Sequence, residues 1–224
     1  MDGTTEQKIF APGYGEFYTG GGGDVEALAL AVPTDALSET TPTELMTLQA
    51  GANSIFDAAA SKDWKAASAT VKQMTTAWGT FRAGEVPRLI EPRMTRALGS
   101  LAKAVDAQDP AQARQAAIDT ARWSLDLQLR YRPPAEIDLA RFDLWAAQLL
   151  VDAAAGDAAA VSGDVFTLFY IRDRILHTLG GADVTSVNIE LGKLQSAGFD
   201  EDLTRAAGAA ARLRDAVVGI EAGG

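Results

Sequence analysis

The charged residues best placed to do chemistry lie in the middle of the chain, on segments that are otherwise apolar at helical spacing. Arg122 falls on one line with Ile118 and Leu125, and Asp143 and Arg172 interrupt similar apolar lines further along. Residues three or four apart share one face of a helix, so these three charges would point into a core. An unpaired charge in a core costs several kcal/mol. Each of the three is therefore predicted to meet a counter-ion, a ligand or water.

Two interpretations of these inward-facing charges stay open. In the first, they form a structural network of ion pairs. That network would include the charged residues around the turn at Pro133 and Pro134, which are Asp126, Arg130, Arg132, Glu136, Asp138 and Arg141. In the second, the arginines line a polar pocket between the central helices that binds a small polar or anionic ligand. The residues predicted to line that pocket are Arg122, Asp126, Asp143, Arg172, Asp173 and His177.

Asp173 and His177 are four residues apart, so one helix face could present both to a metal, or the carboxylate could orient the imidazole. A metal site needs further ligands, and the sequence holds no Glu-x-x-His pair to supply them. Met46, Met74 and Met94 would allow a Met–His haem or copper site, although methionines at helical spacing usually fill gaps in a core. We therefore expect no resident metal or other cofactor.

Nine arginines between positions 82 and 141 make the middle of the chain locally basic. They are Arg82, Arg88, Arg93, Arg96, Arg114, Arg122, Arg130, Arg132 and Arg141. A cationic patch that faces a partner would be one consequence. Interleaved acidic residues nearly cancel this charge along the sequence, which favours a mixed, solvated surface instead. These acids are Glu85, Glu91, Asp106, Asp119, Asp126, Glu136, Asp138 and Asp143.

The composition excludes several classes of function. The 224 residues carry 20 Lys plus Arg against 30 Asp plus Glu, a formal charge of −10, which disfavours nucleic acid and anionic lipid as partners. There is no cysteine and a single histidine, so disulfides, thiolate catalysis and multi-histidine metal sites are excluded within one chain. The sequence has no Gly-x-Ser-x-Gly elbow and no run of 18 apolar residues, so a serine hydrolase and membrane insertion are not expected.

Residues 1–42 differ from the rest and are predicted to form an arm or linker. Gly20 to Gly23 are typical of a turn, which favours either a short β-hairpin across the glycines or an irregular arm. The polar, glycine-rich opening favours an extracytoplasmic protein whose leader has been removed, while a cytosolic terminus stays open.

Residues 43–224 are predicted to form one all-α domain of about four antiparallel hairpins. The expected helices are 43–60, 64–82, 87–107, 110–131, 135–154, 158–179, 184–196 and 200–220. The residues that resemble N-caps are Thr43, Asp63, Asp109 and Asp157. The phrases that begin at Asp57, Asp106 and Asp152 are versions of one another and lie 49 and 46 residues apart, with a degenerate copy at 198–200. Because segments 135–154 and 158–179 are apolar nearly all round, a closed bundle is favoured over an open solenoid.

These observations favour a non-enzymatic, soluble binding or accessory domain with the small-ligand pocket described above. A helical-repeat scaffold for protein partners is one alternative. A metal- or haem-binding bundle that uses Asp173 and His177 is a second.

Overall fold

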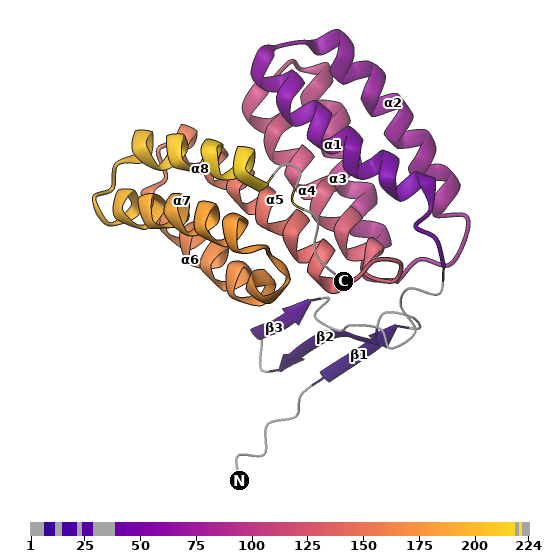
Figure 1. Cartoon of the computed structure of the whole chain (residues 1–224). Coiled ribbons are helices and arrows are strands. Elements are labelled where there is room, and N and C mark those ends of the chain that lie inside the picture. The colour runs from indigo at the N-terminus through magenta and orange to yellow at the C-terminus, as the bar shows by residue number, and fades with distance from the viewer. Residues whose placement is uncertain (1–6, 12–14, 22–23, 29–38, 218–219, 221–224) are drawn as a thin grey trace.

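The computed structural model describes residues 7–11, 15–21, 24–28, 39–217 and 220, and Figure 1 shows their arrangement. From residue 43 onward these residues are almost entirely helical, as expected. The helices are α1 (Thr43–Ser61), α2 (Trp64–Phe81), α3 (Glu91–Asp106), α4 (Pro110–Gln128), α5 (Pro134–Ala155), α6 (Ala158–Ile175), α7 (Gly181–Phe199) and α8 (Leu203–Val217), with a 3₁₀ turn, η1 (Leu176–Thr178), after α6. Within this part of the chain no helix has the length and apolar character needed to cross a membrane.

The eight helices form two closed groups of four. In the first, α1 packs on α2, α2 on α3, α3 on α4, and α4 returns to α1. In the second, α5, α6, α7 and α8 close in the same way, and α4 packs on α5 between the groups (Figure 1). The all-α fold of antiparallel hairpins is thus confirmed, and the hairpins close on one another in pairs.

Helix α5 contributes to two separate apolar cores. Its residues Ile137 and Leu144 join the core of α1–α4, whereas Phe142 and Leu149 join the core of α6–α8. This explains why the sequence of this segment is apolar on nearly all sides. The same expectation for α6 is wrong, because Phe166 on its outer face is 66% exposed.

The four hairpins turn at four corners of the same geometry. Each first helix ends at a residue with positive φ: Lys62 (60°), Gln108 (53°), Gly156 (78°) and Glu201 (52°). The aspartate that follows donates its backbone N–H to a carbonyl five residues earlier, as in the link from Asp109 N to Ala104 O of 3.0 Å. The side chain of that aspartate then caps the next helix, as in the 3.0 Å bond that Asp109 Oδ1 accepts from Gln112 N.

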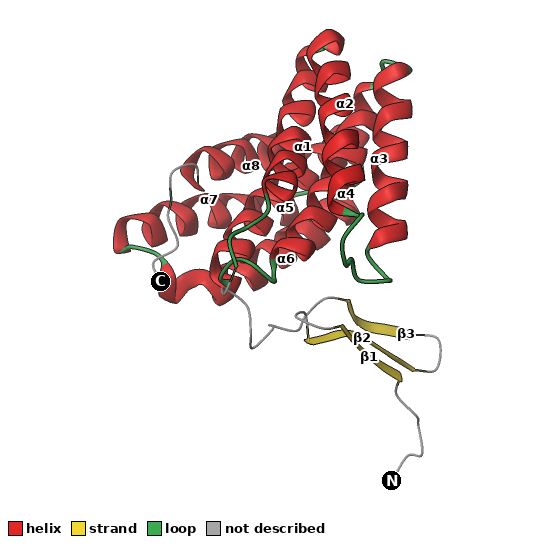
Figure 2. Cartoon of the chain, turned by 90° about the vertical axis from the view of Figure 1, so that its right-hand side faces the viewer, coloured by secondary structure: helices red, strands yellow, loops and turns green. Residues whose placement is uncertain are grey.

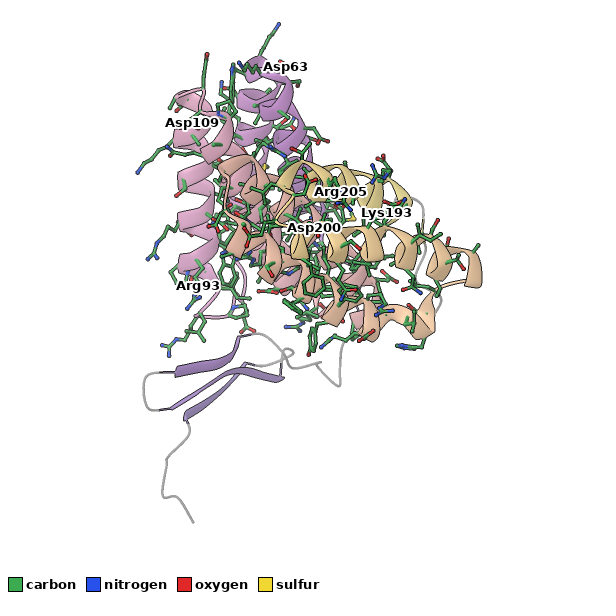
Figure 3. The ribbon with its side chains drawn as sticks, turned by 90° about the vertical axis from the view of Figure 1, so that its left-hand side faces the viewer. Asp63, Arg93, Asp109, Lys193, Asp200 and Arg205 are labelled. Atoms are coloured by element: carbon green, nitrogen blue, oxygen red, sulfur yellow. The ribbon has the colours of Figure 1, made fainter. Side chains whose placement is uncertain are left out.

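The corner aspartates mark an internal repeat. Asp63, Asp109, Asp157 and Asp202 lie 46, 48 and 45 residues apart. The residues eight before them are all fully buried: Ile55, Leu101, Leu149 and Leu194. The residues eleven after them are fully buried as well: Met74, Thr120, Leu168 and Leu213. The corners therefore repeat as predicted for the first three copies, whereas the fourth is centred on Asp202 and not on residues 198–200. Figure 3 shows Asp63 and Asp109 at the same end of the α1–α4 group.

Three predicted helix starts and one predicted cap differ from the structure. Helix α1 begins at Thr43 as predicted, but its N-cap is Pro42 and not Thr43. Helix α7 begins at Gly181 and not at 184. Helix α3 starts at Glu91 and not at 87, because Pro92 lacks the N–H that would bond to the carbonyl four residues back. Helix α8 starts at Leu203 and not at 200, because the positive φ of Glu201 and the cap from Asp202 come first.

The arm forms a three-stranded antiparallel sheet of β1 (Gln7–Ala11), β2 (Gly15–Gly21) and β3 (Asp24–Leu28), in the order β1-β2-β3. Of the two forms that the sequence left open for the arm, the described residues show the hairpin, since Gly21 of β2 pairs with Asp24 of β3. Strand β1 was not expected. Figure 2 shows the sheet outside the helical body. Residues 29–38 of the predicted arm lie outside the described residues.

The corner geometry predicts opposite effects for two neighbouring substitutions. Asp109→Ala removes the cap of α4 and should lower the free energy of unfolding by about 1 kcal/mol. Gln108→Gly relieves a positive φ and should raise it by up to about 1 kcal/mol. Urea denaturation of both variants measures these changes. Equal destabilisation by both would contradict the assigned geometry.

Candidate functional site

The charges at the turn between α4 and α5 form a buried network that joins three helices. Arg141 of α5 donates to Asp126 of α4 at 2.6 Å and to Asp138 at 3.2 Å, and Arg174 of α6 donates to Asp138 at 2.7 Å. Asp126 and Asp138 are only 6% and 5% exposed. Burial raises the pKa of Asp126 although Arg141 and Arg122 oppose the shift. Asp126 is thus held by arginine side chains of the protein itself, as the structural interpretation expects.

Asp143 takes part in a second, separate ion pair. Arg214 of α8 donates to its two carboxylate oxygens at 2.8 and 3.3 Å, and this guanidinium also lies 5.1 Å from the centre of the Phe56 ring of α1. The adjoining crevice has a free volume of about 10 Å³, which is room for about one water molecule. The ion pair therefore joins α5 to α8, the contact of Arg214 with Phe56 connects it to the other helical group, and the crevice leaves no space there for an organic ligand.

Three further residues of the predicted pocket belong to α6 and η1: Arg172, Asp173 and His177. Arg172 donates to Asn188 of α7 at 2.9 Å, and its Nε lies 2.9 Å from Asp173 Oδ1. Asp173 and His177 are both exposed. Within the described ranges, no three His, Cys, Asp or Glu residues are grouped so that they could hold a metal ion.

The methionines that a haem or copper site would need have different surroundings. Met74 and Met94 are fully buried core residues, whereas Met46 is 49% exposed. The second alternative, a metal- or haem-binding bundle, stays a prediction without a contact that supports it.

Arg122 has yet another set of neighbours. It lies 4.0 Å from Asp119 and its guanidinium sits 5.5 Å from the centre of the Trp145 ring. The six residues predicted for one pocket are therefore distributed over several contacts, and Arg122 lines a large surface groove. The other arginine of the set, Arg172, is engaged by Asn188 and Asp173.

The groove that Arg122 faces lies between α3 and α4, with a volume of about 590 Å³. We call it the arginine groove. Its lining residues are Leu89, Pro92, Arg93, Arg96, Ala97, Ser100, Asp119, Arg122 and Trp123. Helix geometry places Arg93, Arg96 and Ser100 on one face of α3, because these positions are spaced by three and four residues. The groove combines three guanidinium groups, one indole and a single carboxylate.

The two arginines of α3 are available to a ligand. The Arg93 guanidinium lies 5.2 Å from the centre of the Trp123 ring, a cation–π contact that leaves its N–H groups free to donate. Within the structure's described ranges no acidic side chain forms an ion pair with Arg93 or Arg96. Figure 3 shows Arg93 at the outer edge of the helical body, at the opposite end from Asp109. The groove is thus a local concentration of positive charge on an acidic protein.

The sequence alone did not identify this groove, although all three arginines belong to the basic stretch described above. Along the chain, the interleaved acids cancel them. In the fold, Asp126, Asp138 and Asp143 are engaged elsewhere by arginines of α5, α6 and α8. The spacing of Arg93 and Arg96 was the local signal, but only the pairing of the acids makes the groove cationic.

A buried carboxyl group, that of Asp164, is paired with the half-buried carboxyl of Asp152 and is influenced by the charge of Arg122. Asp164 of α6 is 4% exposed, and its Oδ2 receives no hydrogen bond from a described donor. Burial raises the pKa of Asp164 to about 8, with further contributions from a hydrogen bond to the Asp152 carboxyl and repulsion by Asp152 and Asp157, while Arg122 opposes the shift. One carboxyl of the pair must carry the shared proton, so Asp164 is neutral at pH 7.

The raised pKa of Asp164 predicts that the free energy of unfolding depends on pH. An unfolded aspartate titrates near 3.8, so between about pH 4 and pH 8 the native state holds a proton that the unfolded state has lost. The free energy of unfolding should therefore fall as the pH rises through this window. Asp164→Asn should remove that slope and add on the order of 1–3 kcal/mol at pH 8, with little change at pH 4. Urea denaturation across this range measures it. Asp106→Asn, at an exposed position, is the control, and an unchanged slope in Asp164→Asn would contradict the assignment.

The ion-pair network predicts a large and local cost. Arg141→Met leaves Asp126 buried without its cation and should lower the free energy of unfolding by about 3 kcal/mol. Arg205→Met, which breaks an exposed pair with Asp200, should cost less than about 1 kcal/mol. Thermal and urea unfolding compare the two variants. Similar small losses in both would show that the network adds little to stability.

Comparison with models of known protein families, with curated proteins and with solved structures finds no significant match for this chain. A function must therefore rest on the chemistry of the site. The scaffold alternative draws on another surface, the outer face of α6, where Phe166 and Tyr170 are 66% and 61% exposed. It stays a prediction.

Proposed function

We propose that this protein is a non-enzymatic binding protein that holds a small anionic ligand in the arginine groove. The observation that carries the proposal is the groove's lining, in which Arg93, Arg96 and Arg122 are accompanied by one carboxylate, that of Asp119. Guanidinium groups bind carboxylates and phosphates through two parallel hydrogen bonds, which gives both affinity and orientation. The predicted small-ligand function is kept, and its site moves from the central helices to the α3–α4 face.

The lining favours binding over catalysis. General acid–base or nucleophilic catalysis needs an activated side chain beside a partner that orients it. In the groove, the carboxylate of Asp119 lies against Arg122, and the remaining polar groups are arginines, a serine and an indole. The histidine of the chain, His177, belongs to η1 in the other helical group.

The ligand is proposed to be small because of the charge of the whole molecule. A formal charge of −10 repels an extended polyanion, whereas a compact anion inside the groove experiences mainly the local arginines. The groove volume of about 590 Å³ lies within the usual range for small-molecule sites.

Thermal unfolding with inorganic phosphate as the probe tests this function. A ligand that binds only the native state stabilises it by about 2.7 kcal/mol at a concentration 100 times its Kd. We expect a saturable rise in Tm with phosphate, beyond the effect of sodium chloride at equal ionic strength. The rise should be lost in the double variant Arg93→Gln/Arg96→Gln.

Lys65→Gln is the matched control, because it removes one exposed positive charge near Asp63, at the other end of the helical group. It should leave the rise in Tm intact. A phosphate effect that does not saturate, or one that Lys65→Gln reduces as much as the groove variant does, would overturn the proposed function.

A further inference from the structure

The arginines of the groove come from two different helices, which bears on the kind of anion it takes. Resting on the proposed function, we infer that the ligand is a small organic dianion whose two anionic groups are joined by a short carbon linker. One group is bound by Arg93 and Arg96 of α3, and the other by Arg122 of α4.

The α3 half of the site is a pair of guanidinium groups on one helix face. Arg93 and Arg96 are three residues apart, so their side chains leave the helix side by side. The contact with Trp123 holds the Arg93 guanidinium 5.2 Å from the indole centre and so limits its motion before a ligand arrives. Because both guanidinium groups line the same groove, they can bind one carboxylate or one phosphate group together.

The α4 half is a single guanidinium with its own support. Arg122 lies between Asp119, 4.0 Å away, and the Trp145 ring, and its side chain is still 38% exposed. Asp119 lies on α4 one turn before Arg122, so the acid orients the guanidinium without covering it. Three arginines and one aspartate leave two formal positive charges in the lining, which favours a ligand with two anionic groups.

Part of the groove lining is apolar. Leu89, Pro92 and Ala97 from the α3 side and the indole of Trp123 line the groove together with the charged groups. A hydrocarbon linker between the anionic groups would be stabilised by contact with these apolar side chains. An inorganic polyanion would leave the same side chains in contact with water. Dicarboxylates and phosphorylated carboxylic acids share this chemistry.

Titration calorimetry on the full chain tests the inference with four probes: acetate, succinate, 3-phosphoglycerate and pyrophosphate. Succinate or 3-phosphoglycerate should bind at least about tenfold tighter than acetate, because the second anionic group gains charge-assisted hydrogen bonds from Arg122. The affinities of succinate and 3-phosphoglycerate, compared with each other, show whether the second anionic group is preferred as a carboxylate or as a phosphate. Pyrophosphate carries two charged ends without a carbon linker and should bind more weakly than the better of the two.

Variants of Arg122 connect the preference to α4. Arg122→Gln should lower the affinity for the preferred dianion to the level of acetate and leave acetate unchanged. Arg122→Lys keeps the charge and loses the fork, so it should retain part of the preference and serves if Arg122→Gln unfolds. Thermal unfolding without probe checks both folds, and Lys65→Gln should bind every probe as the unchanged protein does.

The outcomes separate this inference from the proposed function. Equal affinity for acetate and both organic dianions, unaffected by Arg122→Gln, would overturn the dianion and leave the anion-binding function standing. Pyrophosphate that binds as tightly as the preferred organic dianion would overturn the carbon linker. Failure of all four probes, together with failure of phosphate to raise the Tm, would overturn both proposals.

Discussion

Three aspartates on α4 and α5 are each paired with an arginine, and these pairs connect the organisation of the helices to the charge of the surface. Asp126, Asp138 and Asp143 would be costly to bury alone, and arginines of α5, α6 and α8 compensate them. The same pairing joins α4 to α5 and α5 to the helices after it. Acidic residues that would otherwise neutralise the α3–α4 face are thereby engaged inside the protein. A cationic groove on a chain of charge −10 is the consequence.

The helices that present this groove are set by a repeated local device. At each corner a residue in the left-handed region ends one helix, and an aspartate starts the next. Because the device fixes where a hairpin turns, it also fixes which residues face inward eight positions before and eleven positions after it. Two hairpins close into each group of four helices, and α5 serves both cores. The groove lies on α3 and α4, which belong to one hairpin, so the arginines on its two sides keep a fixed spacing.

Arginine supplies the recognition in this arrangement because its fork is planar, permanently charged and able to stack on an indole. Trp123 supports Arg93, and Trp145 lies against Arg122. Such support lowers the conformational entropy that a ligand would otherwise have to remove.

The sequence by itself determined the local structure: the helices, the caps at Asp63, Asp109 and Asp157 and the period of the repeat. These features depend on residues within a few positions of one another, so composition and spacing suffice to predict them. It also indicated that Arg122, Asp143 and Arg172 would need partners. Tertiary structure alone decided which partners those are, because Asp126 meets Arg141 at a separation of 15 residues, Asp138 meets Arg174 at 36, and Asp143 meets Arg214 at 71. Charge is summed along a sequence but acts through space, and only the packing of the helices separates the arginines of the groove from the acids that surround them in the chain.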